Sequence, residues 1–443
     1  MISIASSSMK QTLYQYLLQY RRAFKKRSYF LFSWLITAML CTEETRSIKF
    51  LYDTFIKKYC SKALNCFYYF LSYANFSCEL LLQITVKISL SLIPEELKPF
   101  VTIFLATDDT LQAKFGRKFD CCFHLFDHTN KNGTSYLDGH CFVSLVINIP
   151  LFWGSRLKYL SIPIGYRLYD KHQSKLEIAA ALVKAVMPLL GDYQVILLCD
   201  SWYPKGEVID TVKQYPNLDL IAAVRWDTAL YELPPAPTGK RGRPRKYGDP
   251  IDIKSLKYEK IGDYYVATRQ LLTNLFETQP VEVTVTTTDT KTFDSIKVFI
   301  STVKGQDIKI FKEHEVEGIA NEPQAAKYLP YFAYSLRWGI EVIFYEHKFF
   351  WSFGNYMVRN QPAIERYVNM LAIAFAFVQM LPFITPRFCE YQFQSPQTVK
   401  HAVADRLTQE LIFDTFVKRL ENNKIYCAVK NAVDDFLSLG YTA

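Results

Sequence analysis

The spacing of apolar residues divides the chain into a helical first part and a strand-rich second part. From about residue 10 to 95, apolar and aromatic residues recur every three or four positions with few glycines, which predicts four or five packed helices. The apolar run 29–41 has only 13 residues, whereas about 20 are needed to cross a bilayer. We therefore expect a buried helix there, and no membrane partner.

After residue 100 the pattern changes to short strands around one amphipathic helix, predicted over 175–190. The expected strands, which are separated by turn residues or by that helix, lie at 101–107, 141–150, 159–168, 193–200 and 218–227. The last two are apolar on both sides, which is typical of parallel strands in an α/β sheet.

A β-rich stretch then interrupts the α/β pattern. The loop 233–250 is rich in proline, glycine and basic residues, and the three runs that follow it alternate as antiparallel strands do. Helical periodicity returns at about residue 325. The sequence therefore predicts an all-β insertion between two parts of one α/β unit.

Carboxylates stand where the predicted strands reach one edge of the sheet. The first strand runs into Asp108 and Asp109, and the strand at 193–200 ends on Asp200. The carboxyl edge of an open α/β sheet is the usual place for ligands. A strand-end Asp can equally form a turn or cap a helix, so position alone does not assign these residues.

The aromatic segment 334–352 is predicted to be one helix with a single polar stripe. At 100° per residue, four polar residues share about 60° of one face: Tyr334, Arg337, Glu341 and Lys348. Glu346 points to another face. An exposed Arg337–Glu341 ion pair is the alternative, but the aromatic neighbours leave little of this helix suited to water. We therefore expect Glu341 to face inward while those neighbours hold the helix against the sheet.

The spacing Y-(2)-R-(3)-E-(6)-K of these four residues resembles the signature of the YREK group of bacterial insertion-sequence transposases, which carry a DDE catalytic triad. The resemblance covers about residues 100 to 385. It implies a ribonuclease H-like α/β fold, in which flanking helices cover a mixed sheet that a β-rich insertion interrupts. The apolar periodicity before residue 100 predicts an all-helical N-terminal domain in front of it. The expected units are a helical DNA-binding domain (1–99), a first core part (100–227), the insertion (228–325), a last core part (326–388) and a helical C-terminal region (389–443).

The resemblance also implies a chemistry, namely cutting of transposon ends and joining of the 3′-OH to target DNA with two Mg²⁺ ions, for which Mn²⁺ can substitute. Mg²⁺ takes hard oxygen ligands, and a pair of ions can stabilise both the attacking and the leaving oxygen. By resemblance, Asp109, Asp200 and Glu341 are catalytic metal ligands, and Asp108 is a further ligand. The family acid directly precedes a Thr, which favours Asp109 over Asp108 as the first acid.

DNA contacts are expected at two places. The resemblance implies that Tyr334, Arg337 and Lys348 bind phosphates near the cleaved bond. The net charge of +9 includes a basic cluster at 239–248, which resembles a hook that inserts arginines into a narrow minor groove; a flexible basic loop is the alternative. Its expected DNA-binding residues are Lys240, Arg241, Arg243, Arg245 and Lys246.

The implied partners are double-stranded DNA, as terminal inverted repeats and target, and a second copy of the chain in a homodimeric synaptic complex.

The ten cysteines include no CxxC pair, which fits a reducing bacterial cytoplasm. A cluster of possible zinc ligands lacks the spacing of a zinc site, so core packing is expected for Cys121, Cys122, His124, His128, His140 and Cys141. Two other functions stay open: a metal-dependent DNA nuclease without strand transfer, and an inactive, domesticated DNA-binding relative.

Overall fold

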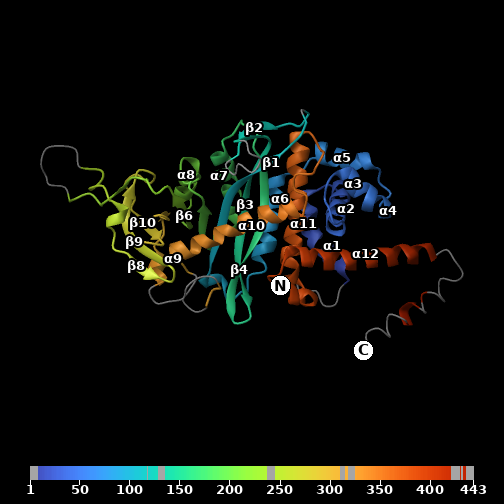
Figure 1. The fold of residues 1–443 in the computed structure, drawn as a ribbon. Coiled ribbons are helices and arrows are strands. Elements are labelled where there is room, and N and C mark those ends of the chain that lie inside the picture. Colours follow the sequence, from blue (N-terminus) through green and yellow to red (C-terminus); the bar gives the residue numbers. More distant parts are fainter. Residues whose placement is uncertain are drawn as a thin grey trace.

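The computed structural model describes most of the 443-residue chain. The described residues are 8–116, 118–127, 135–236, 245–309, 315–317, 325–420, 430 and 433–435. Figure 1 shows a central sheet with the β-rich insertion at one end and the N-terminal helices at the other.

Eleven strands in the described residues form one mixed sheet, in the order β2-β3-β1-β5-β6-β11-β10-β9-β7, with β4 beside β3 and β8 beside β9. The strands are β1 (Thr102–Ala113), β2 (Phe123–Phe126), β3 (Tyr136–Trp153), β4 (Arg156–Leu168), β5 (Gln194–Cys199), β6 (Leu218–Val224), β7 (Leu230–Tyr231), β8 (Glu259–Ile261), β9 (Tyr264–Thr273), β10 (Val281–Thr287) and β11 (Lys297–Ser301). Strands β1, β5 and β6 are parallel, and the other pairings are antiparallel. The predicted mixed α/β fold is confirmed.

The first strand is longer than the sequence predicted. Asp108 and Asp109 were expected at its end, but β1 continues to Ala113 because antiparallel pairing with β3 supports it up to that residue. Its parallel partner β5 ends earlier, at Cys199, opposite Thr107. Asp108 and Asp109 therefore lie within β1, just beyond the last residue of β1 that pairs with β5.

The β-rich insertion is an extension of the core sheet. Strand β11 pairs antiparallel with β6 through Val298 and Val224, so β11, β10 and β9 continue the sheet beyond the core strands. The apolar residues of β10 and β11 are buried, and so are Thr284 and Thr286 of β10. The insertion thus shares the backbone hydrogen bonding of the sheet that carries the acidic residues.

Helices cover the sheet and form the N-terminal part of the chain. They are α1 (Met9–Leu18), α2 (Lys26–Cys41), α3 (Ile48–Leu51), α4 (Lys57–Tyr59), α5 (Leu64–Tyr73), α6 (Cys78–Leu90), α7 (Lys175–Val186), α8 (Glu207–Gln214), α9 (Ala325–Tyr334), α10 (Trp338–Phe349), α11 (Gln361–Ile384) and α12 (Pro396–Leu420). Helix α10 crosses the sheet over β1, β3 and β4 (Figure 1). The run 29–41 falls inside α2, which buries Leu35, Ile36 and their neighbours as expected.

The sequence predicts one helix over 334–352, but the structure has an interruption in this segment. A 3₁₀ turn at Ser335–Arg337 separates α9 from α10. Helix α10 buries a narrow face that includes Ile343 and Phe344, while Trp338, Tyr345 and Phe349 are exposed. The expectation that the aromatic residues hold the helix against the sheet is therefore wrong for its outer face, where Trp338, Tyr345 and Phe349 are exposed.

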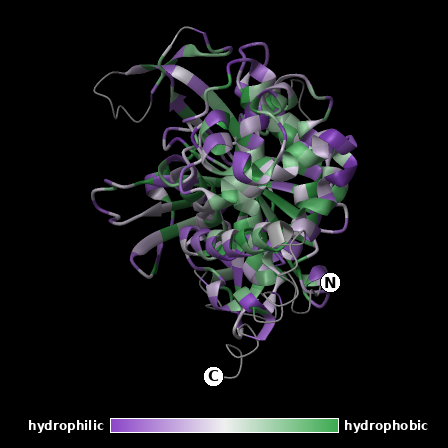
Figure 2. Ribbon diagram, turned by 90° about the vertical axis from the view of Figure 1, so that its right-hand side faces the viewer, coloured by the Kyte–Doolittle hydropathy of each residue, from purple (hydrophilic) through white to green (hydrophobic). Residues whose placement is uncertain are grey.

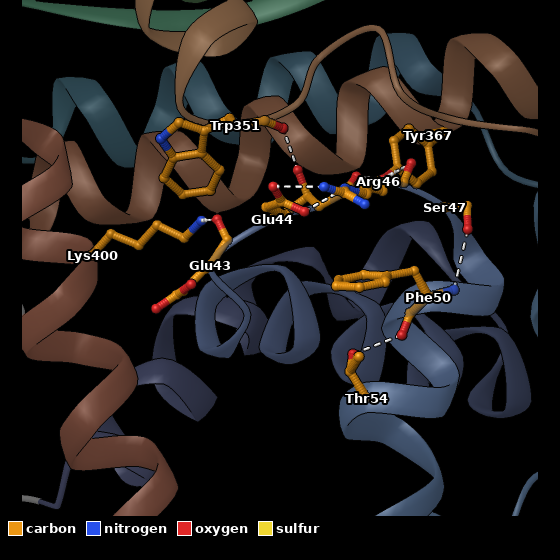
Figure 3. A network of polar contacts seen from close by, with 10 residues as sticks. Glu43, Glu44, Arg46, Ser47, Phe50, Thr54, Trp351, Tyr367 and Lys400 are labelled. Atoms are coloured by element: carbon orange, nitrogen blue, oxygen red, sulfur yellow. Dashed lines mark hydrogen bonds and ion pairs between the residues drawn. The ribbon is translucent and has the colours of Figure 1, made fainter.

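The N-terminal helices are joined to the C-terminal ones by buried contacts around α11. Helix α11 is long and apolar enough to cross a membrane, but 83% of its apolar window is buried inside the protein, and Figure 2 shows hydrophobic segments gathered in the interior. In Figure 3, Lys400 of α12 donates to the backbone oxygen of Glu43 (3.1 Å), and Tyr367 of α11 reaches the backbone of the same connection at Arg46 (3.3 Å). The predicted division into domains stays a prediction.

Candidate active site

Asp108 and Asp200 are neighbours at the end of the parallel strand pair. Both directly follow the paired residues Thr107 and Cys199, and residues side by side in a parallel pair point to the same face of the sheet. Asp200 is the first residue beyond β5, as predicted, and its Oδ1 accepts a hydrogen bond from the backbone N–H of Trp202 (3.0 Å). The fold therefore brings together two acids that are 92 positions apart in the sequence.

Arg337 joins Asp108 of this pair to the helix above it. One guanidinium nitrogen, Nη1, lies 3.1 Å from Asp108 Oδ2 and 3.1 Å from Glu341 Oε1. The side chains of Arg337 and Asp108 are 13% and 15% exposed, whereas that of Glu341 is 39% exposed. The Arg337–Glu341 ion pair, which the i,i+4 spacing allows, is present, but Arg337 also pairs with Asp108 of β1. Glu341 thus lies at the rim of the site and points toward Arg337.

The environment of Asp108 disfavours its negative charge. Burial, followed by the neighbouring carboxylates of Asp200 and Asp109, raises the pKa of Asp108 to about 8, and Arg337 only partly opposes this. Two carboxylates that share a site repel each other unless a cation lies between them. The cluster of Asp108, Asp200 and Glu341 therefore attracts positive charge, which Arg337 supplies in part.

Asp109 faces the opposite side of the sheet, because successive side chains of a strand alternate. Its Oδ2 lies 2.6 Å from Lys175 Nζ, and its Oδ1 accepts a hydrogen bond from the Tyr203 hydroxyl (2.9 Å). The Cys141 thiol also donates to it (3.2 Å). Asp109 is therefore held by three groups that come from α7, β3 and the loop after β5, and Arg337 is not among them.

Local sequence signals place these partners of Asp109. Helix α7 begins at Lys175 because Ser174 and Glu177 form a capping box. Burial raises the pKa of Tyr203 well above its usual value, so its hydroxyl remains a donor. Sequence reasoning missed both residues. Tyr203 could have been suspected from its position three residues after Asp200, whereas nothing near Lys175 in the sequence marks it.

Tyr334 and Lys348, the other two residues of the Y-R-E-K signature, lie in different environments. Tyr334 packs against Phe299 (ring centroids 4.8 Å apart) and lies under the Arg337 guanidinium (5.6 Å); burial raises its pKa to about 12. Lys348 is exposed near the C-terminus of α10. Glu346 points elsewhere, as predicted, and accepts a hydrogen bond from Gln397 of α12.

The expected basic loop is only partly described. Lys240, Arg241 and Arg243 lie outside the described residues. Arg245 forms an ion pair with Asp249 (2.9 Å), and Lys246 lies over the ring of Tyr247 (5.7 Å).

The cysteine and histidine cluster is dispersed in the part of the chain that the structure covers. His140 is buried and bonds to the Tyr356 hydroxyl and the Asp120 carbonyl, whereas His124 is exposed beside Asp138. His128 lies outside the described residues, and the nine cysteines within them are all free thiols. The expected core packing is therefore confirmed for His140 and is wrong for His124.

The acids fit a divalent cation by chemistry. Among the described residues, no three His, Cys, Asp or Glu side chains lie close enough together to hold a metal ion. Asp108, Asp200 and Glu341 nevertheless offer the hard oxygen ligands that Mg²⁺ prefers, and a cationic group already contacts two of them. Burial and the nearby carboxylates of Asp200 and Asp109 raise the pKa of Asp108, and a bound cation would favour its ionised form.

Comparison with known proteins agrees with this geometry. Residues 34–275, more than half of the chain, match the family model described as DDE superfamily endonuclease. The match includes Asp108, Asp109 and Asp200 and ends before Glu341. No curated protein matches the chain. Endonucleases of this superfamily act on DNA and generally use divalent metal ions. The chain therefore belongs to the DDE superfamily of endonucleases.

Proposed function

We propose that the protein is a DDE transposase of the YREK group, which cuts transposon ends and joins the 3′-OH to target DNA. The observation that carries the proposal is the bridge from Arg337 to both Asp108 and Glu341, beside Asp200. Arg337 contacts two acids from distant parts of the chain, and Asp200 is close enough to Asp108 to raise its pKa; a metal-dependent phosphoryl-transfer site needs such a group of carboxylates.

Asp108 is the first catalytic acid in this proposal, in place of Asp109. Asp108 shares a face of the sheet with Asp200 and contacts Arg337, whereas Asp109 is occupied by Lys175 and Tyr203. A carboxylate that already neutralises a lysine is a poor metal ligand, because binding a metal would leave the lysine unpaired. The proposed role of Asp109 is to fix β1, α7 and the loop after β5 relative to one another.

Asp108, Asp200 and Glu341 would hold the metal ions, which we propose are two Mg²⁺, replaceable by Mn²⁺. Bound there, the ions would supply activation of the attacking oxygen and stabilisation of the leaving 3′ oxygen. Arg337 contacts the carboxylates of Asp108 and Glu341, and its planar fork also suits phosphate. Lys348, seven residues after Glu341 and about 10 Å along the helix, extends the phosphate-binding surface.

The substrate in this proposal is duplex DNA with terminal inverted repeats, bound by a homodimer in a bacterial cytoplasm. Arg245, Lys246 and the neighbouring basic residues would contact the DNA away from the cut. The DNA that flanks the gene supplies the first test, because short inverted repeats there would identify the ends to use as substrate.

A strand-transfer assay with those ends tests the proposed reaction. Donor DNA with 3′-OH ends and a target plasmid are incubated with the protein and Mg²⁺, and a matched reaction contains chelator. Joined products support a transposase, cuts without joining support the nuclease, and binding without either product supports a domesticated DNA-binding relative. Equal cleavage in chelator contradicts a metal-dependent site.

A further inference from the structure

Gly339 packs directly against the sheet at the start of α10, which crosses β1, β3 and β4 (Figure 1). A Cβ atom on Gly339 would lie 2.1 Å from Ser161 Oγ and 2.9 Å from Ser161 Cβ in β4, and 3.3 Å from Asn148 Oδ1 in β3. Real Cβ atoms essentially never approach another heavy atom to less than 3.0 Å. The serine oxygen therefore occupies the space that any other residue at position 339 would need.

The two residues under Gly339 form a buried polar pair. Ser161 Oγ donates to Asn148 Oδ1 (2.5 Å), and Asn148 Nδ2 donates to the Phe104 carbonyl of β1 (3.4 Å). The pair thus joins β4, β3 and β1 beneath the helix, and Asn148 is fully buried. Rotation of the Ser161 hydroxyl away from the helix would cost this hydrogen bond and would still leave the Ser161 Cβ too close. The sheet therefore resists displacement at this point.

The fit at Gly339 fixes α10 along its axis. The buried residues of the helix are mostly apolar, and hydrophobic contact is non-directional, so it does not by itself fix the position of a helix. A shift by one residue would place the side chain of Trp338 or Ile340 over Ser161, where even a methyl group lacks room. Close packing therefore requires the glycine to lie over Ser161.

We propose that Gly339 is a positioning residue, which sets the place of Glu341 relative to the acids of the sheet. This inference rests on the proposed function. Glu341 lies two residues after Gly339, about 3 Å further along the helix, and Arg337, two residues before Gly339, contacts Asp108. A methyl group at position 339 would lift this part of α10 by about 0.9 Å, since the closest approach must rise from 2.1 Å to 3.0 Å. Mg²⁺ demands near-ideal geometry of its ligands, so this displacement should weaken its binding.

The test is Gly339→Ala in the full-length protein. Alanine favours a helix more than glycine does, so a defect would come from the contact with the sheet. Urea unfolding with and without Mg²⁺ reports metal binding without turnover, because a metal that binds only the folded protein raises the unfolding midpoint. Gly339→Ala should lose most of this Mg²⁺-dependent shift. Its cleavage should be about 10- to 100-fold slower, since a misplacement of about 1 Å can cost about 100-fold.

A second substitution makes room on the sheet side of the contact. Ser161→Gly removes the two atoms that a methyl group at position 339 would approach most closely. The double variant Gly339→Ala, Ser161→Gly should therefore recover most of the Mg²⁺-dependent shift and most of the cleavage rate, although the extra glycine in β4 should lower its stability. Such a recovery is the non-additive behaviour expected of two residues in contact.

Gly165→Ala is the matched control. Gly165 also lies in β4, and a Cβ there would lie 2.7 Å from Leu82 Cδ1, but Leu82 belongs to α6 and not to α10. This substitution crowds the other side of the same strand. It should alter stability alone and keep both the Mg²⁺-dependent shift and the cleavage per folded molecule.

The variants together decide the proposal. A wild-type response to Mg²⁺ in Gly339→Ala overturns it, and so does an equal loss of that response in Gly165→Ala. A double variant that binds Mg²⁺ no better than Gly339→Ala also overturns it. If Gly339→Ala does not fold, a double variant that folds and cuts supports the proposal, and one that does not overturns it. A wild-type protein whose stability and cleavage do not respond to Mg²⁺ overturns the proposed function instead.

Discussion

Replacement by Asn should have opposite effects at the adjacent acids Asp108 and Asp109. At Asp109 it should mainly lower the free energy of unfolding, and at Asp108 it should mainly lower cleavage activity. Asp109→Asn removes the charge that pairs with Lys175 at 2.6 Å, where the two side chains are 18% and 22% exposed. Breaking a fully buried pair costs about 3–5 kcal/mol, and an exposed pair is worth about 0–1 kcal/mol. For this partly exposed pair we expect a loss of about 2–3 kcal/mol in the free energy of unfolding. Cleavage per folded molecule should be reduced but present.

Asp108→Asn should leave stability nearly unchanged and abolish cleavage. Burial and the neighbouring carboxylates of Asp200 and Asp109 disfavour the ionised form of Asp108 and offset the stabilisation from its ion pair with Arg337, so a neutral amide of the same shape should change the free energy of unfolding by less than about 1 kcal/mol. Loss of an outer-shell partner typically lowers metal affinity or activity by about 10–100-fold. Loss of a direct ligand should therefore lower cleavage by at least about 100-fold.

Urea unfolding and Mg²⁺-dependent cleavage, measured on the same preparations, test this contrast. Asp138→Asn is a suitable control, because Asp138 is exposed and pairs only with His124 in the described residues; it should change neither quantity appreciably. The reasoning is refuted if Asp109→Asn is fully stable and inactive while Asp108→Asn still cuts DNA. That result would restore Asp109 as the first acid.

Three further outcomes are expected. Glu341→Gln should abolish cleavage while DNA affinity is kept or slightly raised, because a negative charge near phosphate is removed; Glu346→Gln should still cut, and the reverse result would contradict the assigned helix register. Lys348→Ala should weaken binding to DNA ends and reduce the log–log salt slope by about 0.9, measured from binding isotherms at several salt concentrations; an unchanged slope rules out the phosphate contact. Burial lowers the pKa of His347 to about 3, so the unfolded chain takes up a proton between about pH 6.5 and 3 that the folded protein does not. Stability should therefore fall as the pH falls, with His347 contributing a loss of about 2 kcal/mol between pH 7 and 5; urea unfolding should show a smaller loss in His347→Gln and an unchanged one in the exposed-site control His124→Gln.

The sequence by itself determined the kind and order of the elements, because periodicity is a local property. The apolar run of β5, the amphipathic α7 and the alternating β9 to β11 all formed where their patterns predicted. The position of Asp200 directly after β5 was also predictable, since the apolar run ends there. The Y-R-E-K spacing alone marks Arg337 and Glu341 as candidate site residues.

Only the tertiary structure decided which acids meet. The faces of Asp108 and Asp109 depend on the pairing of β1 with β5, and a shift of one residue in a strand exchanges its faces. The partners of Asp109 are Lys175 and Tyr203, which are 66 and 94 positions away in the sequence. No local pattern encodes such contacts. Arg337, in the 3₁₀ turn before α10, contacts both Asp108 and Glu341, and its contact with Asp108, 229 positions away, forms only when the helix docks on the sheet. The chemistry of the site therefore follows from strand register and helix docking, which arise only when the whole chain is folded.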